Sequence, residues 1–505
     1  MQREAGFLRR KADPSSFTLP SYRPTVSLRP TVPPPYLTPM SDTLMISVSG
    51  MRGIVGKDLT PELVARHAAA LGAWARARGK AVVVLGRDAR TSGPMFARAA
   101  TAGLMSVGVE VIDVGIAPTP TVQLAVEHHH AGAGLILTAS HNPIEWNALK
   151  LVGPDGIFLD GDDGMAVRAL ADAGPPRTGW EGVGTVREDR QAIDRHLHQV
   201  LSLPFIDVAA IRARQFVVAL DCVRGAGGTA IPPLLHELGC KVSAINLETD
   251  GRFPRPPEPV PENLGDLSRL VKESGAAIGL AVDPDVDRLA LVNERGEPIG
   301  EDYTLALAVR AVLGGSAARR LGPTSPGGGA AEPPVVVANL STSLVVEDAA
   351  RMGGARFVRA PVGEANVARV IRDEGALIGG EGNGGVILPY LHIGRDAPVG
   401  VALILHLLAT SGHSVSRLVD GQSRYRIVKV KAQRGNDLGP VYERLVARFK
   451  DATPDTRDGL RLAWPDRWVH VRPSGTEPIV RFIAEAPTQK DAEALVAVCR
   501  ELFTT

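Results

Sequence analysis

Cysteine is scarce in this chain of 505 residues, which contains only Cys222, Cys240 and Cys499. No two of them form a C-x-x-C pair or a zinc-binding spacing. The sequence therefore excludes a disulfide-stapled scaffold and a cysteine-based zinc site. This usage of cysteine favours a reduced, cytoplasmic setting.

Net charge and long apolar runs are lacking as well. The chain has 56 Lys and Arg against 55 Asp and Glu, so its formal net charge is +1. No excess of one sign attracts the protein to nucleic acid or to a membrane surface, and no apolar run is long enough to span a bilayer. We expect neither partner, and any phosphate must be bound by local sites.

The first 44 residues lack apolar periodicity and are rich in Pro, Arg and Ser. They also lack the apolar central block of a secretory signal, and their many prolines argue against the amphipathic helix of a transit peptide. Such a composition cannot bury a core. We expect residues 1–44 to be a disordered extension, or translation to begin at Met40 or Met45.

From Met45 onward, short apolar strands alternate with amphipathic helices, which predicts parallel or mixed sheets covered by helices. One such helix is expected at residues 60–77, with Thr60 as its N-cap and Pro61 in its first turn. After about residue 420 the pattern changes to that of a small α+β domain with an antiparallel sheet. The predicted domains span residues 45–195, 196–301, 302–420 and 421–505.

Three segments share one plan, in which a helix ends in small residues, a short apolar strand follows and a polar loop comes next. They read HAGAGLILTASHN, ESGAAIGLAVDPDVD and DEGALIGGEGNGG. Such repetition predicts three similar αβ domains. Because ligands of open α/β sheets bind beyond the carboxyl ends of strands, we expect chemistry in all three loops.

The second of these loops contains three aspartates at alternate positions, Asp283, Asp285 and Asp287. Carboxylates this close repel each other unless a cation lies among them, and oxygen ligands of this kind suit Mg²⁺ or Ca²⁺. The spacing half-matches a calcium EF-hand loop, but Arg288 stands where that loop needs Gly, and strands flank it. The pattern favours one Mg²⁺ per chain over a solvated acidic turn.

Residues 471–481, VRPSGTEPIVR, predict a phosphate-binding turn. Backbone N–H groups and hydroxyls of the turn can surround a phosphate dianion, and forked arginines at either end can add donors. Two further basic loops, at residues 49–56 and 86–94, follow strands, and the first places Arg52 among glycines.

Ser140 ends the strand of the first loop, yet it does not lie in the G-x-S-x-G turn of a hydrolase nucleophile. A serine alcohol is a poor nucleophile, and no base is evident in the sequence. A phosphoserine explains the neighbouring signals. Ser140 would carry a phosphoryl group, the three aspartates would hold Mg²⁺ against it, and Arg288 would neutralise its charge.

These motifs together resemble the α-D-phosphohexomutase family. TASHNP is similar to its phosphoserine loop, DPDVDR to its metal loop, GEGNGG to its sugar-recognition loop and RPSGTEP to its phosphate loop. SGMRG and GRDARTSG match two further family segments, and the likeness covers about residues 45 to 505 in the family's order. The resemblance implies three related αβ domains and a small mobile C-terminal domain around a central cleft.

The resemblance also implies a reaction, the reversible transfer of phosphate between the 1- and 6-positions of a hexose phosphate. A hexose 1,6-bisphosphate serves as intermediate and activator, and the partner is a small-molecule phosphosugar. The implied catalytic residues are Ser140, Lys150, Arg52, His141 and Arg288, and the implied metal ligands are Ser140, Asp283, Asp285 and Asp287. The implied substrate-binding residues are Glu381, Asn383, Arg472, Ser474, Gly475, Thr476 and Arg481.

Two departures from the family pattern bear on the substrate. The phosphoserine loop, usually N-G-x-K, reads Asn147-Ala148-Leu149-Lys150, and the sugar loop, G-E-x-S-G-H in many members, has Asn383 for serine and Gly385 for histidine. With GRDAPVG at residues 394–400, this variant resembles a phosphoglucosamine mutase-like branch. Mannose or glucose phosphate as the substrate, a non-catalytic relative and a magnesium-dependent phosphatase remain alternatives, and a monomer or homodimer is expected.

Overall fold

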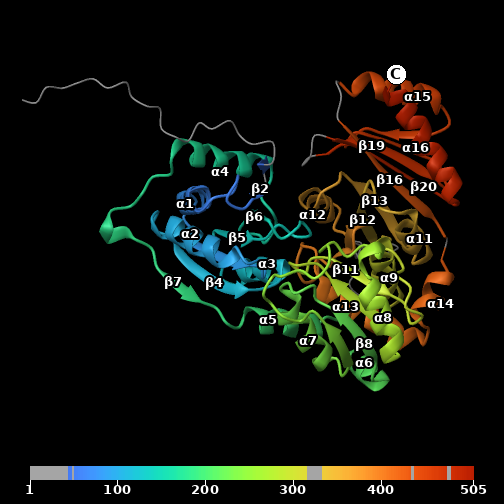
Figure 1. The fold of residues 1–505 in the computed structure, drawn as a ribbon, viewed down its shortest axis with the longest axis horizontal. Coiled ribbons are helices and arrows are strands. Elements are labelled where there is room, and N and C mark those ends of the chain that lie inside the picture. Colours follow the sequence, from blue (N-terminus) through green and yellow to red (C-terminus); the bar gives the residue numbers. More distant parts are fainter. Residues whose placement is uncertain are drawn as a thin grey trace, which may run out of the picture. The chain divides into compact units, whose positions relative to one another are not determined.

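The computed structural model describes residues 44–47, 50–315, 332–422, 424–433, 437–474 and 479–504. All of the predicted extension except Leu44 therefore lies outside the described residues. Figure 1 colours the chain from its N-terminal elements in blue to its C-terminal elements in red. Within the described ranges, none of the helices combines the length and apolarity that crossing a membrane requires.

The first sheet has seven strands in the order β1-β2-β6-β5-β3-β4-β7. The strands β5, β3, β4 and β7 run parallel, and β6, β2 and β1 add antiparallel pairs at one side. Helices α1, α2 and α4 share a core on one face, and α3 packs on the other. Their bounds are β1 Met45–Ser47, β2 Gly50–Ile54, α1 Pro61–Ala77, β3 Val82–Arg87, α2 Gly93–Met105, β4 Glu110–Ile116, α3 Thr119–His128, β5 Ala133–Leu137, β6 Trp146–Val152, α4 Gly161–Ala173 and β7 Val186–Glu188.

Helix α1 begins where the sequence predicts. The Thr60 hydroxyl accepts a hydrogen bond from the Leu63 backbone N–H, and Pro61 occupies the first turn, where no N–H is needed. Its alanine-rich buried face packs closely on α2, because Gly103 lets the backbones approach. A Cβ at Gly103 would come within 2.2 Å of the Ala65 carbonyl oxygen.

The second and third sheets have four strands each, in the orders β11-β10-β8-β9 and β13-β12-β14-β15. In both, three parallel strands are joined at one edge by an antiparallel strand that follows a polar loop. Their elements are α5 Ala192–Leu201, α6 Val208–Arg214, β8 Val217–Asp221, α7 Gly227–Glu237, β9 Lys241–Ile245, α8 Gly265–Ser274, β10 Ile278–Val282, β11 Leu289–Val292, α9 Asp302–Gly314, β12 Val335–Asn339, α11 Leu344–Met352, β13 Arg356–Ala360, α12 Glu364–Asp373, β14 Ile378–Glu381, β15 Gly385–Ile387, α13 Ala397–Ser411 and α14 Val415–Asp420.

One four-strand plan recurs in all three sheets. The orders β6-β5-β3-β4, β11-β10-β8-β9 and β15-β14-β12-β13 are equivalent, so the predicted similarity of three αβ units is confirmed. Each polar loop joins a buried parallel strand to the antiparallel strand beside it. The loop is therefore a hairpin at the carboxyl end of a parallel strand, where ligands of such sheets bind.

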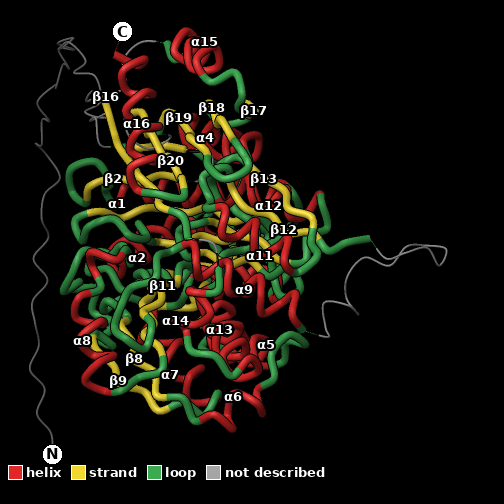
Figure 2. Tube along the Cα trace, turned by 90° about the vertical axis from the view of Figure 1, so that its right-hand side faces the viewer, coloured by secondary structure: helices red, strands yellow, loops and turns green. Residues whose placement is uncertain are grey.

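The C-terminal part forms a five-stranded antiparallel sheet in the order β16-β20-β19-β18-β17, as predicted. Helices α15 and α16 share one core with it. Figure 2 shows these two helices in red against the yellow strands. Their bounds are β16 Arg426–Gln433, α15 Gly439–Arg448, β17 Thr453–Asp455, β18 Leu460–Ala463, β19 Trp468–Pro473, β20 Ile479–Ala486 and α16 Gln489–Thr504.

Buried polar contacts join the fourth sheet to the start of α11. The Glu485 carboxylate accepts hydrogen bonds from the Ser343 hydroxyl and from the Leu344 backbone N–H, 2.8 Å away, at the helix N-terminus. His470 contributes a second contact, in which Nδ1 lies 2.8 Å from the Ser341 hydroxyl and Nε2 lies 2.6 Å from the Asp458 carbonyl oxygen. Burial lowers the pKa of His470 to about 4.

His470 is expected to make stability depend on pH. Its folded pKa lies below the ordinary histidine value of about 6.5, so the unfolded chain takes up a proton first as pH falls. Neutral His470 therefore contributes to the free energy of unfolding, and this contribution is complete above about pH 6.5. It disappears towards pH 4 and amounts to roughly 3 kcal/mol. Unfolding at several pH values, with His470→Gln beside wild type, measures it.

The His470→Gln variant should lose less stability than wild type between pH 7 and pH 4.5. The exposed His413 provides the matched control, since His413→Gln should keep the wild-type pH dependence. Equal losses in wild type and His470→Gln would contradict this assignment.

Candidate active site

The first and second polar hairpins meet at Ser140. This residue follows β5, and its hydroxyl donates a hydrogen bond of 2.8 Å to Asp283 Oδ2, which follows β10. Both side chains are buried, at 3% and 0% exposure. The structure therefore brings together a hydroxyl and an acidic turn that lie 143 positions apart in the chain.

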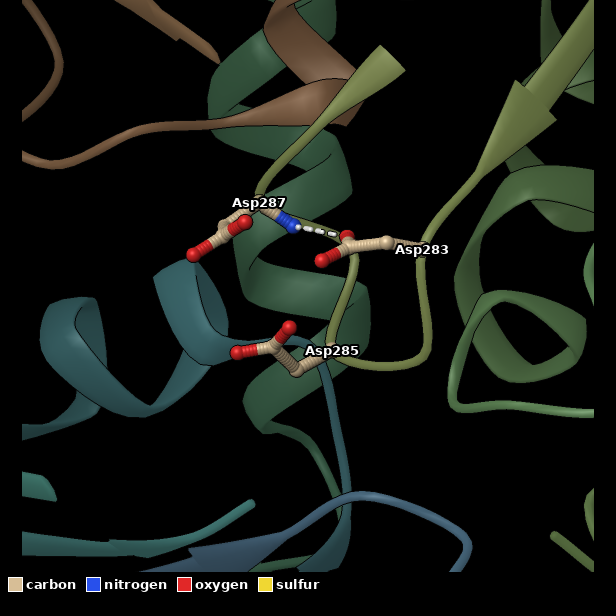
Figure 3. Close-up of side chains that lie close together, drawn as sticks. All are labelled: Asp283, Asp285 and Asp287. Atoms are coloured by element: carbon tan, nitrogen blue, oxygen red, sulfur yellow. Dashed lines mark hydrogen bonds between the residues drawn. The ribbon is translucent and has the colours of Figure 1, made fainter. Parts of the chain in front are cut away.

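The acidic turn gathers oxygen ligands around one space. One carboxylate oxygen from each of Asp283, Asp285 and Asp287 lies within 4.8 Å of the others, and all three residues are buried (Figure 3). Within the described part of the chain, Asp285 Oδ1 and Asp287 Oδ1 have no hydrogen-bond partner. Buried carboxylate oxygens require a partner, so these residues fit a hard divalent cation such as Mg²⁺.

Burial and repulsion act together on Asp283. Burial, together with the charges of Asp287 and Asp285, raises the pKa of Asp283 well above its ordinary value. Backbone N–H groups of Asp287 and Arg288 donate to Asp283 Oδ1, each at 3.2 Å, and the first is the dashed line of Figure 3. The turn thus holds a carboxylate where a negative charge is unfavourable until a cation arrives.

Both loops contain left-handed backbone at a residue other than glycine. Ser140 has a φ of 49° and Val286 a φ of 62°, a conformation that a β-branched residue rarely adopts. Such strain persists only where surrounding contacts impose it, and it is common at active sites. At Ser140 the contacts include its backbone N–H, which donates to the Thr138 hydroxyl 2.9 Å away.

Arg90 binds the backbone of the loop that contains Ser140. Its guanidinium is fully buried and donates to four backbone carbonyl oxygens, at distances of 2.6 to 2.9 Å. These oxygens belong to Ser140, Asn142, Pro143 and Trp146. Its Nε pairs with Asp88, 3.0 Å away. The sequence marks this basic loop without assigning Arg90, and the GRDAR pattern is the signal that could have found it.

Lys150 lies against the acidic turn rather than apart from it. Its Nζ is 2.7 Å from Asp285 Oδ2 and 3.5 Å from Asp287 Oδ2. Burial acts to lower the pKa of Lys150, but these carboxylates outweigh burial and raise it. The Thr119 hydroxyl also donates to Asp285 Oδ2 at 2.8 Å, a contact that the sequence does not predict. Lys150 is thus a protonated amine in this arrangement.

His141 contacts Ser140, and Arg52 and Arg288 lie close enough to His141 for their charges to act on it. Arg52 donates to the Asn142 side-chain oxygen at 2.6 Å, and His141 Nδ1 lies 3.4 Å from the Ser140 hydroxyl. Burial and the charges of Arg288 and Arg52 hold the pKa of His141 well below its ordinary value, so its imidazole is neutral at pH 7. Arg288 Nη1 contacts the Glu258 carboxylate at 3.4 Å. The group combines fixed positive charge with one neutral base.

A cleft of about 1040 Å³ opens beside Arg52 and His141. Its charged lining is mostly basic, and it consists of Arg52, Arg255, Lys429, Lys431 and Arg481 with the acids Glu145, Glu258 and Glu301. Arg481 belongs to β20, so the fourth sheet contributes to this wall. Among the described residues, the lining does not include the three aspartates or Glu381, which are buried. A cleft with this charge suits an anionic ligand.

The remaining predicted residues lie in two places, at the end of β19 and at the end of β14. Arg472 pairs with Asp458 at 2.9 Å, and Ser474 is buried beside β20. Gly475 and Thr476 lie outside the described residues. At the end of β14, Glu381 accepts from Asn339, 2.9 Å away, and more weakly from Asn383, 3.4 Å away. Glu381 also contacts Arg395, a residue that the sequence does not single out for a role in the site.

Comparison with known proteins agrees with this arrangement. Four descriptions of one family match successive parts of the chain. "Phosphoglucomutase/phosphomannomutase, alpha/beta/alpha domain I" matches residues 44–176, domain II residues 194–296, domain III residues 302–425 and the C-terminal domain residues 428–502.

Related sequences and a solved structure cover most of the chain. A protein from Thermococcus kodakarensis named "Phosphoglucomutase/phosphomannomutase" is 38% identical over 449 residues, 88% of this chain and 94% of that protein. A Methanopyrus kandleri protein named "Probable phosphoglucosamine mutase" is 36% identical over 451 residues, 88% of this chain and 95% of its own. A crystal structure of a phosphoglucomutase/phosphomannomutase family protein from Burkholderia thailandensis superposes with a TM-score of 0.77 at 27% identity, covering 91% of this chain and 97% of that one. The chain belongs to the phosphoglucomutase/phosphomannomutase family and is a phosphohexomutase.

Proposed function

We propose that this phosphohexomutase interconverts glucosamine 6-phosphate and glucosamine 1-phosphate, with Ser140 as its phosphate carrier. The observation that carries the role of Ser140 is its hydroxyl, 2.8 Å from Asp283 in a buried, strained loop beside the acidic turn. A hydroxyl placed against a cation site, in a loop that Arg90 binds, suits phosphoryl transfer, where positioning and charge stabilisation supply most of the catalysis.

Each half-reaction moves one phosphoryl group. The P–O bond to Ser140 breaks as a P–O bond to a sugar hydroxyl forms. The sugar hydroxyl proton passes to a base, and the freed Ser140 oxygen takes up a proton. The resulting hexose 1,6-bisphosphate turns over and returns its other phosphoryl group to Ser140, which gives up its hydroxyl proton while the freed sugar oxygen gains one. Atoms therefore balance over the cycle, and added bisphosphate can prime an unphosphorylated chain.

The chain's own groups support these steps. Asp283, Asp285 and Asp287 would hold Mg²⁺, which when bound supplies positive charge against the phosphoryl oxygens. Neutral His141, 3.4 Å from the Ser140 hydroxyl, suits the acceptance of a proton. Protonated Lys150 suits the opposite role of donor or electrostatic partner. Arg52 and Arg288 add fixed positive charge near the reacting phosphate.

The sugar and its second phosphate would use the other loops. Arg481 in the cleft, together with Arg472, Ser474, Gly475 and Thr476, would hold the phosphate that does not react. Glu381 and Asn383 would hydrogen-bond the sugar hydroxyls. Two clusters of basic groups suit a molecule with a phosphate at each end, which favours a mutase over a phosphatase.

The choice of sugar rests on names and on the sugar loop. The Methanopyrus kandleri relative is named as a phosphoglucosamine mutase, and the loop variant with Asn383 and Gly385 resembles that branch. The Thermococcus kodakarensis relative, at 38% identity, is named as a phosphoglucomutase/phosphomannomutase, which supports glucose or mannose phosphate as the second candidate.

Initial rates on the 6-phosphates of glucosamine, glucose and mannose test the proposal. With Mg²⁺ and a trace of the matching bisphosphate, glucosamine 6-phosphate should give the largest kcat/KM, by about tenfold or more. The reason is that the three sugars differ by only one or two hydrogen bonds to the protein. A preference for glucose or mannose would establish the second candidate instead. Intact mass should show one phosphoryl group on the purified protein.

A further inference from the structure

Arg395 joins the metal loop to the sugar loop. It lies between β15 and α13, is 6% exposed, and its guanidinium contacts three carboxylates from three segments. Nη2 donates to Asp287 at 2.6 Å, Nη1 donates to Glu381 at 3.0 Å, and Nε donates to Glu364 at 3.1 Å. Each nitrogen of the guanidinium therefore has a different acidic partner.

The planar guanidinium makes this connection rigid. Its donors have a fixed fork geometry, so the two terminal nitrogens set how far apart, and at what angle, Asp287 and Glu381 lie. A lysine ammonium is a single point charge on a flexible stem and cannot impose that geometry. Buried, charge-assisted hydrogen bonds of this length are among the stronger contacts in proteins.

Arg395 also decides which oxygens remain for ligands. It binds Asp287 Oδ2 and leaves Oδ1, which has no hydrogen-bond partner among the described residues and lies 3.8 Å from Arg288 Nε. At Glu381, Oε1 accepts from Asn339 and from the Gly363 backbone N–H. Oε2 accepts from Arg395 and, over the longer distance of 3.4 Å, from Asn383. A sugar hydroxyl could replace that last, weak contact while Arg395 keeps the carboxylate in place.

Gly385 provides the space that Arg395 occupies. A Cβ at this position would come within 2.2 Å of Arg395 Cδ and 2.9 Å of its Cγ, closer than atoms can approach. The sugar loop of many family members has histidine here, and no side chain fits at this position while Arg395 stays where it is. In this chain, Gly385 therefore leaves the space that the Arg395 side chain fills.

We propose that Arg395 is a positioning residue that fixes Glu381 relative to Asp287, so that sugar binding and Mg²⁺ binding depend on the same side chain. The inference rests on the proposed function only in taking Glu381 as a sugar-binding group and the aspartates as metal ligands. Arg395 acts through its contacts with these two carboxylates.

Two variants test this role by different routes. Arg395→Lys keeps the positive charge but loses the forked donor geometry of the guanidinium. Gly385→Ala keeps the arginine, but the added Cβ displaces its side chain. Both should lower kcat/KM by about 10- to 100-fold, as loss of an outer-sphere partner does. Both should raise the sugar KM and weaken Mg²⁺ binding, measured by calorimetry without substrate. Arg351→Lys, exposed on α11, and Gly161→Ala, with open space around its Cβ, are matched controls and should behave as wild type.

A double-mutant cycle with Glu381→Gln separates positioning from stability. If Arg395 acts on the sugar through Glu381, Arg395→Lys should add little to the KM increase of Glu381→Gln, while Mg²⁺ binding weakens only when Arg395 is changed. A side chain that only stabilises the fold would lower the melting temperature and leave KM and Mg²⁺ affinity unchanged, and that result would overturn the inference.

The outcome can be told apart from a failure of the proposed function. If wild type turns over none of the three hexose phosphates, the proposed function fails, and calorimetry with Mg²⁺ alone still tests the contact between Arg395 and Asp287. If wild type is active and Gly385→Ala matches it in KM and Mg²⁺ affinity, only the role of Arg395 is refuted.

Discussion

Replacing Ser140 by alanine should abolish mutase activity, with a fall on the order of 10⁴-fold or more, because no phosphoryl group can then be carried between the two half-reactions. The fold should survive. Arg90 binds the backbone oxygens of the loop rather than the serine side chain, and the lost hydroxyl makes its described hydrogen bonds to Asp283 and His141 alone. Coupled assays in both directions, with added bisphosphate, measure the loss.

Intact mass provides an independent readout. Wild type incubated with hexose bisphosphate should carry one added phosphoryl group, and Ser140→Ala should carry none. Ser202→Ala removes an exposed hydroxyl and serves as the matched control, which should keep both phosphate and activity. Turnover of Ser140→Ala at the wild-type rate, or retention of its phosphate, would refute the carrier assignment.

The Asp283→Asn variant should lose function without losing stability. An asparagine oxygen can still accept from the Asp287 and Arg288 backbone N–H groups, and its NH₂ can donate to the Ser140 hydroxyl. Mutase activity should nevertheless fall by about 10³-fold, because the loss of one anionic ligand removes several kcal/mol of charge stabilisation at the phosphoryl group.

The stability of Asp283→Asn follows from the sign of the pKa shift. Burial and two neighbouring carboxylates raise the pKa of Asp283, so the folded protein without metal holds a proton that the unfolded chain releases. Ionised Asp283 therefore opposes folding as pH rises above the ordinary carboxyl pKa, and asparagine removes that cost. Without Mg²⁺ the variant should unfold at the wild-type temperature or above it.

Thermal unfolding with and without Mg²⁺ checks this expectation. Mg²⁺ should raise the melting temperature of wild type, because it binds the folded state, and should have little effect on Asp283→Asn. Asp266→Asn, on the exposed surface of α8, should keep the wild-type response. A variant that is much less stable without Mg²⁺, or that responds to Mg²⁺ as wild type does, would contradict the metal assignment.

The sequence predicted most of what local patterns encode. Apolar runs bounded by helices predicted the strands β3, β5, β10 and β14, because a buried strand needs a continuous apolar segment. Thr60 and Pro61 predicted the start of α1, since capping involves residues three positions apart. The repeated strand-to-loop pattern placed Ser140, the aspartates and Glu381 at strand ends, where each of them lies.

The antiparallel neighbours of these strands were harder to predict. A strand was expected after the acidic loop, where β11 lies, but periodicity alone does not state the direction in which a strand pairs. The hairpins that present the polar loops therefore emerged only from the structure.

By itself, the sequence determined the repeated αβ units, the antiparallel C-terminal sheet and the chemical character of each polar loop, because these follow from hydrophobic period, turn residues and local spacing. Only the tertiary structure decided that Arg90 supports the loop of Ser140 and that Arg395 joins Asp287 to Glu381. The contacts of Arg90 with Ser140 and of Arg395 with Asp287 link residues 50 and 108 positions apart, and a guanidinium on a loop has no local preference for a partner. The partner of each arginine depends on which strand ends come together in the fold, because a buried carboxylate there needs a positive charge beside it.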